Sequence, residues 1–427
     1  MTNEELFEMY KSEITMHPDA RASEIANKFF IPTGVMAYMN DKIKNDDKLF
    51  RIVSSVYPRF MKESCDFVTE NVNVINNFLT GKRFYPLILE FHPGVFCNHK
   101  CEFCFNLFDD YDEKINHFNT IKPKKFDEVC NDCRNNGVKE IWFSGGKEPL
   151  TNADFITFLE IAHAYGFITR IYTNGVLLDP KWETLDKCSQ IRISVNASTS
   201  DVFMKVCGAS NPIIYDKLIE KIKVLVNRKK ISSNFMAKIA VSFMVQGDNC
   251  HQMRNFFEKF VDIGVDSIQF RLDSIGRVPK LTIPEKDSVI LQSAEITESV
   301  LKNNPKTFVD LRGVVEDEFN RELLPGIRKP AVCMAGMIKR GINPFSKVYQ
   351  CEYSSHPHFK GESKRLILGN VNDESFHDIM SKNVGFYPEV CKFCQAHEYG
   401  MNVLLEKLSD DLKFGLAIKD QIFYKGK

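Results

Sequence analysis

Three cysteines stand close together in the segment Cys97-Asn-His-Lys-Cys101-Glu-Phe-Cys104. Three thiolates on one short loop can bind three irons of a cubane iron–sulfur cluster and leave the fourth iron open, whereas a closed cluster or a structural zinc site normally needs four protein ligands. No better fourth ligand is evident, because the backbone of His99 is held between two cysteines and Cys130 and Cys133 lie on a predicted helix, where cysteines usually pack in the core. Three thiolates with one open iron is therefore the most economical interpretation.

A second group of cysteines occurs near the C-terminus. Its members are Cys333, Cys351, Cys391 and Cys394. Four thiolates can satisfy all the irons of a cubane cluster or hold one zinc ion. These cysteines include only one Cys-x2-Cys pair, whereas a zinc ribbon has two, so a zinc ribbon fits the spacing less well. Both an iron–sulfur cluster and a zinc ion remain as alternatives for this group.

Polar and small residues follow several predicted strands at the point where each strand ends. Gly145, Gly146 and Glu148 follow the second strand, where glycines expose backbone carbonyls to a ligand and a carboxylate can pair with an ammonium group. Ser194 and Asn196 close the fourth strand, and strand alternation predicts that their side chains point the same way. Each of these residues has an alternative role as an ordinary turn residue.

The sixth strand ends in Gln269, Arg271 and Asp273, which alternation places on one face. Three polar residues in a barrel interior are costly unless they bind something, and Arg271 could hold a carboxylate with its planar guanidinium group. The alternative places this face toward solvent or the last domain. Cys207, which follows the fourth strand, is a buried apolar residue or a thiol that donates a hydrogen atom.

The elements that must position these residues alternate between strands and helices from about residue 84 to residue 301. Predicted helices cover 124–136, 154–165, 213–227, 253–263 and 285–301. Predicted strands cover 87–91, 140–143, 168–172, 191–196, 239–245 and 267–272. This order predicts a parallel sheet or an open barrel, in which ligands lie at the carboxyl ends of the strands.

Composition is that of an ordinary globular protein. The 427 residues include 56 basic and 56 acidic side chains, and 44% of residues are hydrophobic. The zero formal charge gives no reason to expect nucleic-acid binding. The N-terminus lacks a secretory signal and no apolar run approaches about 20 residues, so we expect a cytoplasmic protein that does not interact with membranes.

The first cysteine segment resembles the cluster loop of the radical S-adenosylmethionine (SAM) superfamily, in which an aromatic residue, here Phe103, precedes the third cysteine. The resemblance implies a [4Fe–4S] cluster on Cys97, Cys101 and Cys104 whose open iron binds SAM. It also implies reductive cleavage of SAM to a 5′-deoxyadenosyl radical, which abstracts a hydrogen atom from the substrate.

Further roles follow from the same resemblance. Gly145, Gly146 and Glu148 resemble the family's Gly-Gly-Glu-Pro motif, which holds the methionine amino group, although Lys147 interrupts the motif. Ser194 and Asn196 correspond to polar residues that contact the ribose or the methionine carboxylate. Phe103 and Gln269 complete the expected cofactor-binding set, whereas Arg271 and Cys207 are the expected catalytic residues.

The second cysteine group, placed after such a core, resembles the twitch domain, a shortened SPASM module that holds one auxiliary [4Fe–4S] cluster. The expected fold is a partial (β/α)6 TIM barrel over residues 81–304, preceded by a helical N-terminal domain at 1–80 and followed by an α+β cluster domain at 305–427. The four later cysteines would ligate the auxiliary cluster fully, which favours electron transfer over direct binding of the substrate.

The expected function is oxidation or rearrangement of a polar small molecule, such as a sugar or an aminocyclitol, with the auxiliary cluster as electron acceptor. A reducing partner such as flavodoxin or ferredoxin would supply the electron for SAM cleavage. A second hypothesis is modification of a ribosomally synthesised peptide by crosslinking, epimerisation or oxidation. A third, of another class, is a helix-turn-helix regulator with an iron–sulfur sensor and a zinc ribbon.

Overall fold

The computed structural model describes most of the central part of the chain. The described residues are 85–104, 120–272, 278–303, 305–311, 314, 339–349 and 367–382. The helical domain expected at 1–80, Asp273 and the four later cysteines lie outside them. The structure is therefore informative about the barrel and the first cysteine loop.

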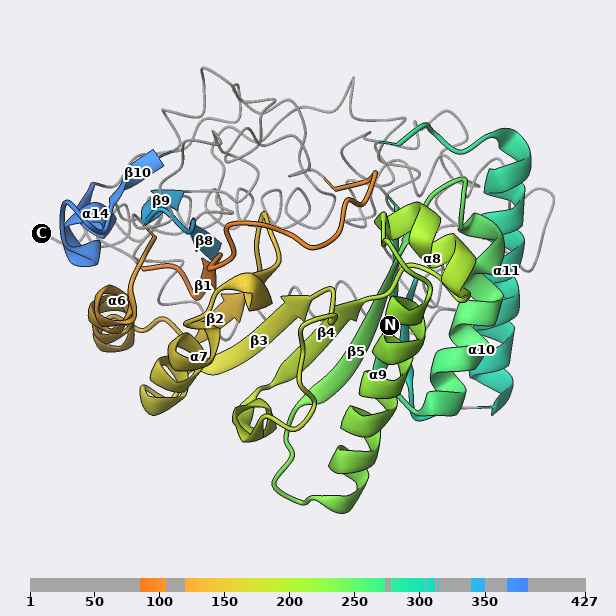
Figure 1. Cartoon of the computed structure of the whole chain (residues 1–427), viewed down its shortest axis with the longest axis horizontal. Helices are drawn as coiled ribbons and strands as arrows, with labels where there is room; N and C mark the ends of the chain where they lie inside the picture. The colour runs from red at the N-terminus through yellow and green to blue at the C-terminus, as the bar shows by residue number, and fades with distance from the viewer. Residues whose placement is uncertain are drawn as a thin grey trace, which may run out of the picture.

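One sheet organises the described residues, in the order β10-β9-β8-β1-β2-β3-β4-β5-β6-β7. Strands β1 to β7 run parallel to their neighbours. Their bounds are β1 Ile88–Phe91, β2 Glu140–Phe143, β3 Ile168–Thr173, β4 Gln190–Ser194, β5 Lys238–Val245, β6 Ser267–Leu272 and β7 Phe308–Leu311. The sheet is curved and open, as expected for a partial barrel (Figure 1).

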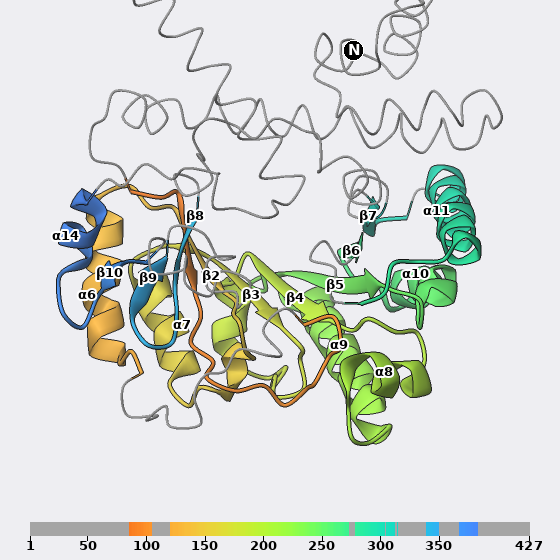
Figure 2. The same cartoon turned by 90° about the horizontal axis from the view of Figure 1, so that it is seen from above.

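Helices connect the strands and cover one face of the sheet (Figure 2). They are α6 Pro123–Asn135, α7 Phe155–Ala164, α8 Ser200–Cys207, α9 Ile213–Ile231, α10 Met253–Ile263 and α11 Ile283–Asn303. Short 3-10 helices lie at η2 Pro149–Thr151, η3 Glu183–Lys187 and η4 Cys250–Gln252. Helix α8 was not expected from the sequence, whereas the other long helices lie where the apolar periodicity predicts them.

The core lies between the sheet and these helices. Alternate residues of each strand point into it, as in Phe91 of β1, whose ring stacks on Phe126 of α6 at 4.4 Å between centroids. At the other end of the sheet, Phe243 of β5 meets Phe256 of α10 at 4.8 Å. Cys130 and Cys133 are fully buried on α6, which confirms their expected packing role.

The opposite face of the sheet carries polar side chains at the alternate positions. The Arg170 guanidinium donates to both carboxylate oxygens of Glu140, at 2.9 and 3.3 Å. The Glu90 carboxylate lies 2.8 Å from the Lys339 ammonium nitrogen. Charged groups that are partly withdrawn from water need such partners. We call this side of the sheet the inner face.

Residues beyond the expected barrel boundary at 304 continue the sheet. Strand β7 extends it beyond β6, and β8 (Lys339–Ile342) pairs in parallel with β1 on the other side. Strands β9 (Lys347–Tyr349) and β10 (Ile367–Asn370) follow β8, and helix α14 (Phe376–Ser381) comes last. The separate domain at 305–427 stays a prediction, but its described strands belong to the same sheet as the barrel.

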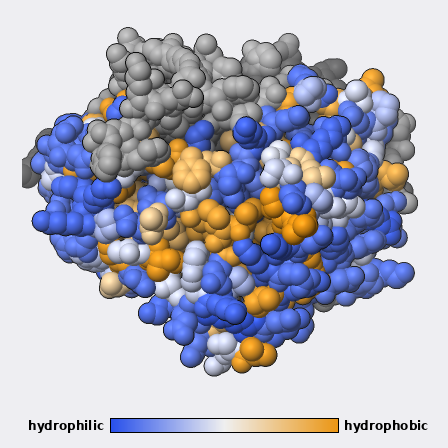
Figure 3. Space-filling model, in the orientation of Figure 1, coloured by the Kyte–Doolittle hydropathy of each residue, from blue (hydrophilic) through white to orange (hydrophobic). Residues whose placement is uncertain are grey.

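The described surface in one view is largely hydrophilic, with hydrophobic side chains gathered in a band across its centre (Figure 3). No helix among the described residues is long and apolar enough to cross a membrane.

Candidate SAM and cluster site

The cysteine loop leaves the carboxyl end of β1 and is held by backbone contacts on two sides. The Lys100 N–H donates to the Cys207 carbonyl at the end of α8 (3.1 Å), and the Glu148 N–H donates to the Phe96 carbonyl (3.2 Å). Gly94 packs directly on Glu148, because a Cβ at this position would come within 2.2 Å of the Glu148 carbonyl oxygen. The loop is thus fixed against both the end of β2 and the end of α8.

Cys97, Cys101 and Cys104 lie on this loop, with Cys97 exposed and the other two half-buried. The Cys104 N–H donates to the Cys101 carbonyl at 3.0 Å, which closes a tight turn between the last two cysteines. Although the residue as a whole is exposed, the protein packed around the Cys97 thiol desolvates it and raises its pKa to about 11. The His99 N–H opposes this effect, and Glu148, Cys101 and Cys104 add to it by charge repulsion. Contact with Cys207 and burial raise the pKa of Cys101 well above its ordinary value. These thiols would ionise on binding a metal.

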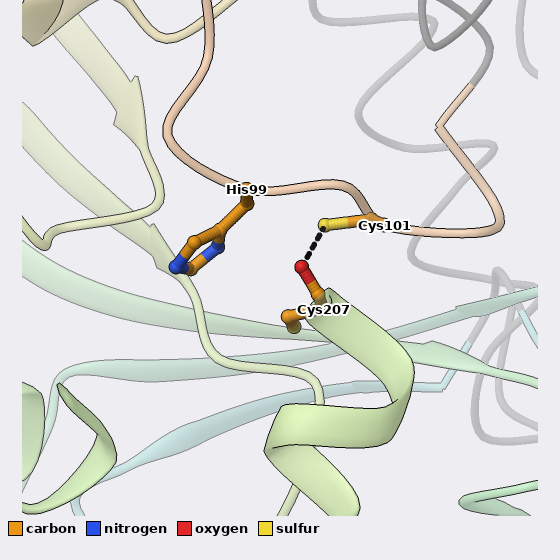
Figure 4. Close-up of side chains that lie close together, drawn as sticks. All are labelled: His99, Cys101 and Cys207. Atoms are coloured by element: carbon orange, nitrogen blue, oxygen red, sulfur yellow. Dashed lines mark hydrogen bonds between the residues drawn. The ribbon is translucent and has the colours of Figure 1, made fainter. Parts of the chain in front are cut away.

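His99 is the unsatisfied group of the loop. Only 5% of the residue is exposed, and neither ring nitrogen has a hydrogen-bond partner. Burial lowers the pKa of its imidazole to about 4. Its ring meets Phe203 of α8 edge-on, and its ligand atoms lie within 4.8 Å of the sulfurs of Cys101 and Cys207 (Figure 4). A buried polar side chain without a hydrogen-bond partner calls for an explanation, and a group bound beside Cys101 would supply one.

These observations fit a [4Fe–4S] cluster on the loop. The donor set is three thiols on eight residues, which is the soft-ligand chemistry that such clusters use. Cys207 approaches Cys101 from α8 but is fully buried, and its thiol donates to the Val195 carbonyl at 3.8 Å. Cys207 is therefore packed beside the loop, in reach of its second cysteine.

Glu148 organises the end of the second strand. The residue is 4% exposed, and its carboxylate accepts three hydrogen bonds, from the Leu150 N–H (3.1 Å), the Thr173 hydroxyl (2.6 Å) and the Asn174 N–H (2.8 Å). Burial raises its pKa, and the three donors oppose this effect. The carboxylate thus joins the β2 loop to the end of β3, in addition to any contact with a bound ammonium group.

The other cofactor-binding residues expected on the loops lie near Glu148. Gly145 stands against the cysteine loop, since a Cβ there would lie 3.6 Å from the His92 Cβ and 2.9 Å from the Lys147 carbonyl oxygen. Gly146 is buried in the same turn. Phe103 is partly buried and packs against the hydrophobic core. The structure therefore gathers these residues around the carboxyl ends of β1 and β2.

Ser194 and Asn196 have different partners at the end of β4. Ser194 lies on the inner face and accepts a hydrogen bond from the Ser242 hydroxyl at 3.4 Å. Asn196 has a left-handed backbone (φ 61°), and its amide accepts from the Met244 N–H (2.8 Å) and donates to the Cys207 sulfur (3.8 Å). Both polar ends of the Asn196 side chain thus have partners in the protein, and its expected role in cofactor binding stays a prediction.

Gln269 and Arg271 lie on the inner face of β6, opposite the buried Phe270. The Gln269 amide accepts from the Arg192 guanidinium (2.8 Å) and donates to the Asp310 carboxylate (3.2 Å). These contacts are made on the inner face, and the roles expected for Gln269 and Arg271 stay predictions. Arg271 is half-buried and lies two residues beyond Gln269, nearer the carboxyl end of β6.

Two residues of the site were not singled out from the sequence for a role. Thr173 ends β3 and Asn174 follows it, and the pattern of a polar residue and glycine at a strand end was the only signal. The Thr173 hydroxyl donates to the Glu148 carboxylate, and the Asn174 amide nitrogen donates to the Cys97 sulfur at 3.8 Å and to the side-chain oxygen Oδ1 of Asn98 at 2.7 Å. The end of β3 therefore touches the cysteine loop directly.

An open parallel sheet that carries a three-cysteine loop after its first strand defines a class of iron–sulfur enzymes built on a partial barrel. Residues 91–237 match the family model described as the radical SAM superfamily, and this matched segment includes the three-cysteine loop. The cofactors of the superfamily are a [4Fe–4S] cluster and SAM, which together supply a radical for hydrogen abstraction. In this chain, the three loop cysteines are the residues that would hold the cluster.

Two curated relatives match part of this chain. An S-adenosylmethionine-dependent nucleotide dehydratase from Flammeovirga pacifica is 28% identical over 166 residues, which cover 37% of this chain and 57% of the relative. A GTP 3′,8-cyclase from Campylobacter fetus is 29% identical over 31% of this chain and 40% of its own length. The chain thus spans about half the length of these relatives.

Solved structures show the same fold. SuiB from Streptococcus suis, bound to S-adenosylmethionine, superposes with a TM-score of 0.55 at 16% identity, covering 78% of this chain and 73% of that chain. At this identity the likeness concerns the fold alone.

Proposed function

We propose that this radical SAM enzyme abstracts a hydrogen atom from a polar, anionic small molecule bound against the inner face of the sheet. A cluster held by Cys97, Cys101 and Cys104 would supply one electron for the cleavage of SAM to methionine and a 5′-deoxyadenosyl radical. The hydrogen atom moves from a substrate carbon to that radical, which yields 5′-deoxyadenosine and a substrate radical. Sugars and aminocyclitols belong to the polar class expected from the sequence.

The inner face is the observation that carries this proposal. The Arg192 guanidinium lies 4.0 Å from the Tyr172 ring centroid and is held by Gln269, so its direction is fixed before a ligand binds. Arg271 lies farther along the same face, toward the carboxyl end that carries the cysteine loop. Guanidinium groups fixed in this way suit the planar oxygen pairs of carboxylates and phosphates.

The names of the relatives support a subset of this class. The nucleotide dehydratase and the GTP cyclase act on nucleotides by their names. Nucleotides combine phosphates, which guanidinium groups bind, with a flat base, which aromatic rings such as Trp142 and Tyr172 of the inner face can stack on. Nucleotides and phosphorylated sugars are therefore the first substrates to test.

The auxiliary cluster on Cys333, Cys351, Cys391 and Cys394 is part of the proposal. It would accept the electron that remains after deprotonation of the substrate radical, so the substrate loses two electrons in total. A flavodoxin- or ferredoxin-type partner would reduce the SAM cluster at the start of each turnover.

The test is anaerobic turnover of the reconstituted full chain with SAM, dithionite and candidate substrates, measured as 5′-deoxyadenosine formed. We expect nucleotides or phosphorylated sugars to stimulate its formation at least tenfold and deuterium from a labelled substrate to enter it. Arg192→Gln should raise the KM for that substrate, whereas Arg254→Gln, on the exposed side of α10, should not. No 5′-deoxyadenosine under any condition would overturn the proposal, and stimulation by peptides alone would replace its substrate class.

A further inference from the structure

The side chain of Asn174 is held in one orientation by the protein. Its Oδ1 accepts a hydrogen bond from the Val176 N–H at 3.0 Å, and a backbone N–H can only donate. The other end of the amide must therefore be the nitrogen, and this end faces Asn98 and the Cys97 sulfur. The two hydrogens of Nδ2 suffice for these two acceptors.

The backbone that carries this amide is also fixed. The Asn174 N–H donates to the buried Glu148 carboxylate at 2.8 Å, and the Gly175 N–H donates to the Thr173 hydroxyl at 2.9 Å. Gly175 has a φ of 76°, and a Cβ there would come within 2.8 Å of the Ile193 side chain. The turn can move little without breaking buried hydrogen bonds, so the amide is already in position when the cysteine loop binds a metal.

A hydrogen bond to a cluster thiolate acts on the redox balance of the cluster. Reduction adds one negative charge, part of which resides on the sulfur ligands, and an N–H directed at a sulfur stabilises the reduced form more than the oxidised form. Groups that orient or hydrogen-bond metal ligands tune metal sites in this way. Removing the donor should lower the reduction potential.

We propose that Asn174 is a positioning residue that donates a hydrogen bond to the Cys97 thiolate and raises the reduction potential of the SAM-binding cluster. The proposal rests on Cys97 as a cluster ligand, but it does not depend on which substrate the enzyme uses. Glu148 and Thr173 take part by holding the turn that presents the amide.

The test is a redox titration of the reconstituted full chain followed by electron paramagnetic resonance. The titrated signal is the one whose shape changes on addition of SAM, which separates it from any second cluster. Asn174→Leu keeps the approximate size and removes the donor, whereas Asn174→Asp keeps an acceptor for the Val176 N–H and also adds a negative charge. We expect a lower potential in both variants, with the larger shift in Asn174→Asp, at unchanged iron content.

Asn98→Ala is the matched control, because it removes the second acceptor of the same amide and leaves the sulfur contact. Its potential should stay at the wild-type value. Wild-type potentials in both Asn174 variants would overturn the proposal, as would an equal shift in Asn98→Ala, which would assign the effect to the loop position. Loss of iron in both Asn174 variants would also overturn it, in favour of a role in cluster assembly. Since no substrate enters the titration, these outcomes are independent of the proposed reaction.

Discussion

The carbonyl group of Lys100 lies directly against Gly208, where the cysteine loop crosses the end of α8. A Cβ on Gly208 would come within 2.7 Å of the Lys100 carbonyl oxygen, and the Lys100 N–H donates to the neighbouring Cys207 carbonyl. Gly208 ends the helix with a left-handed backbone, at φ 60°. A short helix after β4 thus supports the loop that follows β1.

Replacing this glycine should loosen the cysteine loop. Gly208→Ala adds a methyl group against backbone atoms and a left-handed alanine, and we expect it to lower the free energy of unfolding by roughly 1–3 kcal/mol and to reduce iron loading. Gly137→Ala is the control, because Gly137 also has a positive φ (84°) but a Cβ there meets nothing within 4 Å. Equal iron loading in the two variants would show that the contact with Lys100 is unimportant.

The assignment of the two clusters can be tested by their iron content. Replacing Cys97, Cys101 and Cys104 together with Ala should abolish formation of 5′-deoxyadenosine and leave about four irons per chain on the auxiliary site. The measurement is iron and sulfide analysis of the anaerobically reconstituted protein. An unchanged iron content in the triple variant would contradict the assignment of the loop.

The carboxylate of Glu148 should contribute to both stability and SAM affinity. Glu148→Ala leaves buried donors of Thr173 and Asn174 without their acceptor, which should cost about 1–3 kcal/mol of unfolding free energy. SAM binding should weaken by a similar roughly 1–3 kcal/mol, through loss of a charge-assisted contact or displacement of the loop. Denaturant unfolding and equilibrium binding of SAM measure the two effects. Unchanged values of both would refute the role of this residue.

His163 should make the stability of the barrel depend on pH. Its Nε2 lies 2.8 Å from the buried Thr169 hydroxyl, and burial, with a smaller contribution from Lys187, lowers the pKa of the imidazole from 6.5 to about 4. Between these two values the unfolded chain binds a proton that the folded chain does not, so stability should fall as the pH drops from 6.5 towards 4.

The matched variant is His163→Gln, which retains an acceptor and a donor without titrating. Between pH 7.5 and pH 5 the wild type should lose about 1 kcal/mol more than this variant, a value reduced because the ring is partly exposed. Urea denaturation at the two pH values provides the measurement. Parallel losses in both proteins would mean that His163 does not carry the effect.

Much of the barrel could be predicted because its pattern is local. The alternation of apolar residues gave the bounds of α10 and β6 as observed, and those of most other elements within a few residues. Helix α8 was missed because it is short and no side-chain hydrogen bond caps its N-terminus. Its buried Phe203 and Val206 dock it on the core, so its stability comes from packing rather than from a local signal.

The features of the candidate site also divide into those that a short segment of sequence predicts and those that depend on distant segments. The cysteine spacing and the motif of Glu148 can each be recognised within its own short segment of sequence. The family match agrees with the resemblance that they suggested. The partners of Glu148, by contrast, come from the end of β3, and the support of Lys100 comes from α8. Such contacts depend on the packing of distant segments, and nothing within a short segment specifies them. The same holds for the register of β8 on β1.

That register limits how the protein can be divided. Strand β8 covers the outer hydrogen-bonding groups of β1, and the His92 N–H at the start of the cysteine loop donates to the Ile342 carbonyl at 2.9 Å. A fragment truncated before residue 339 would turn β1 into an exposed edge strand, open to pairing with other molecules. Truncation of the C-terminal region would therefore also destabilise the loop that carries the first three cysteines.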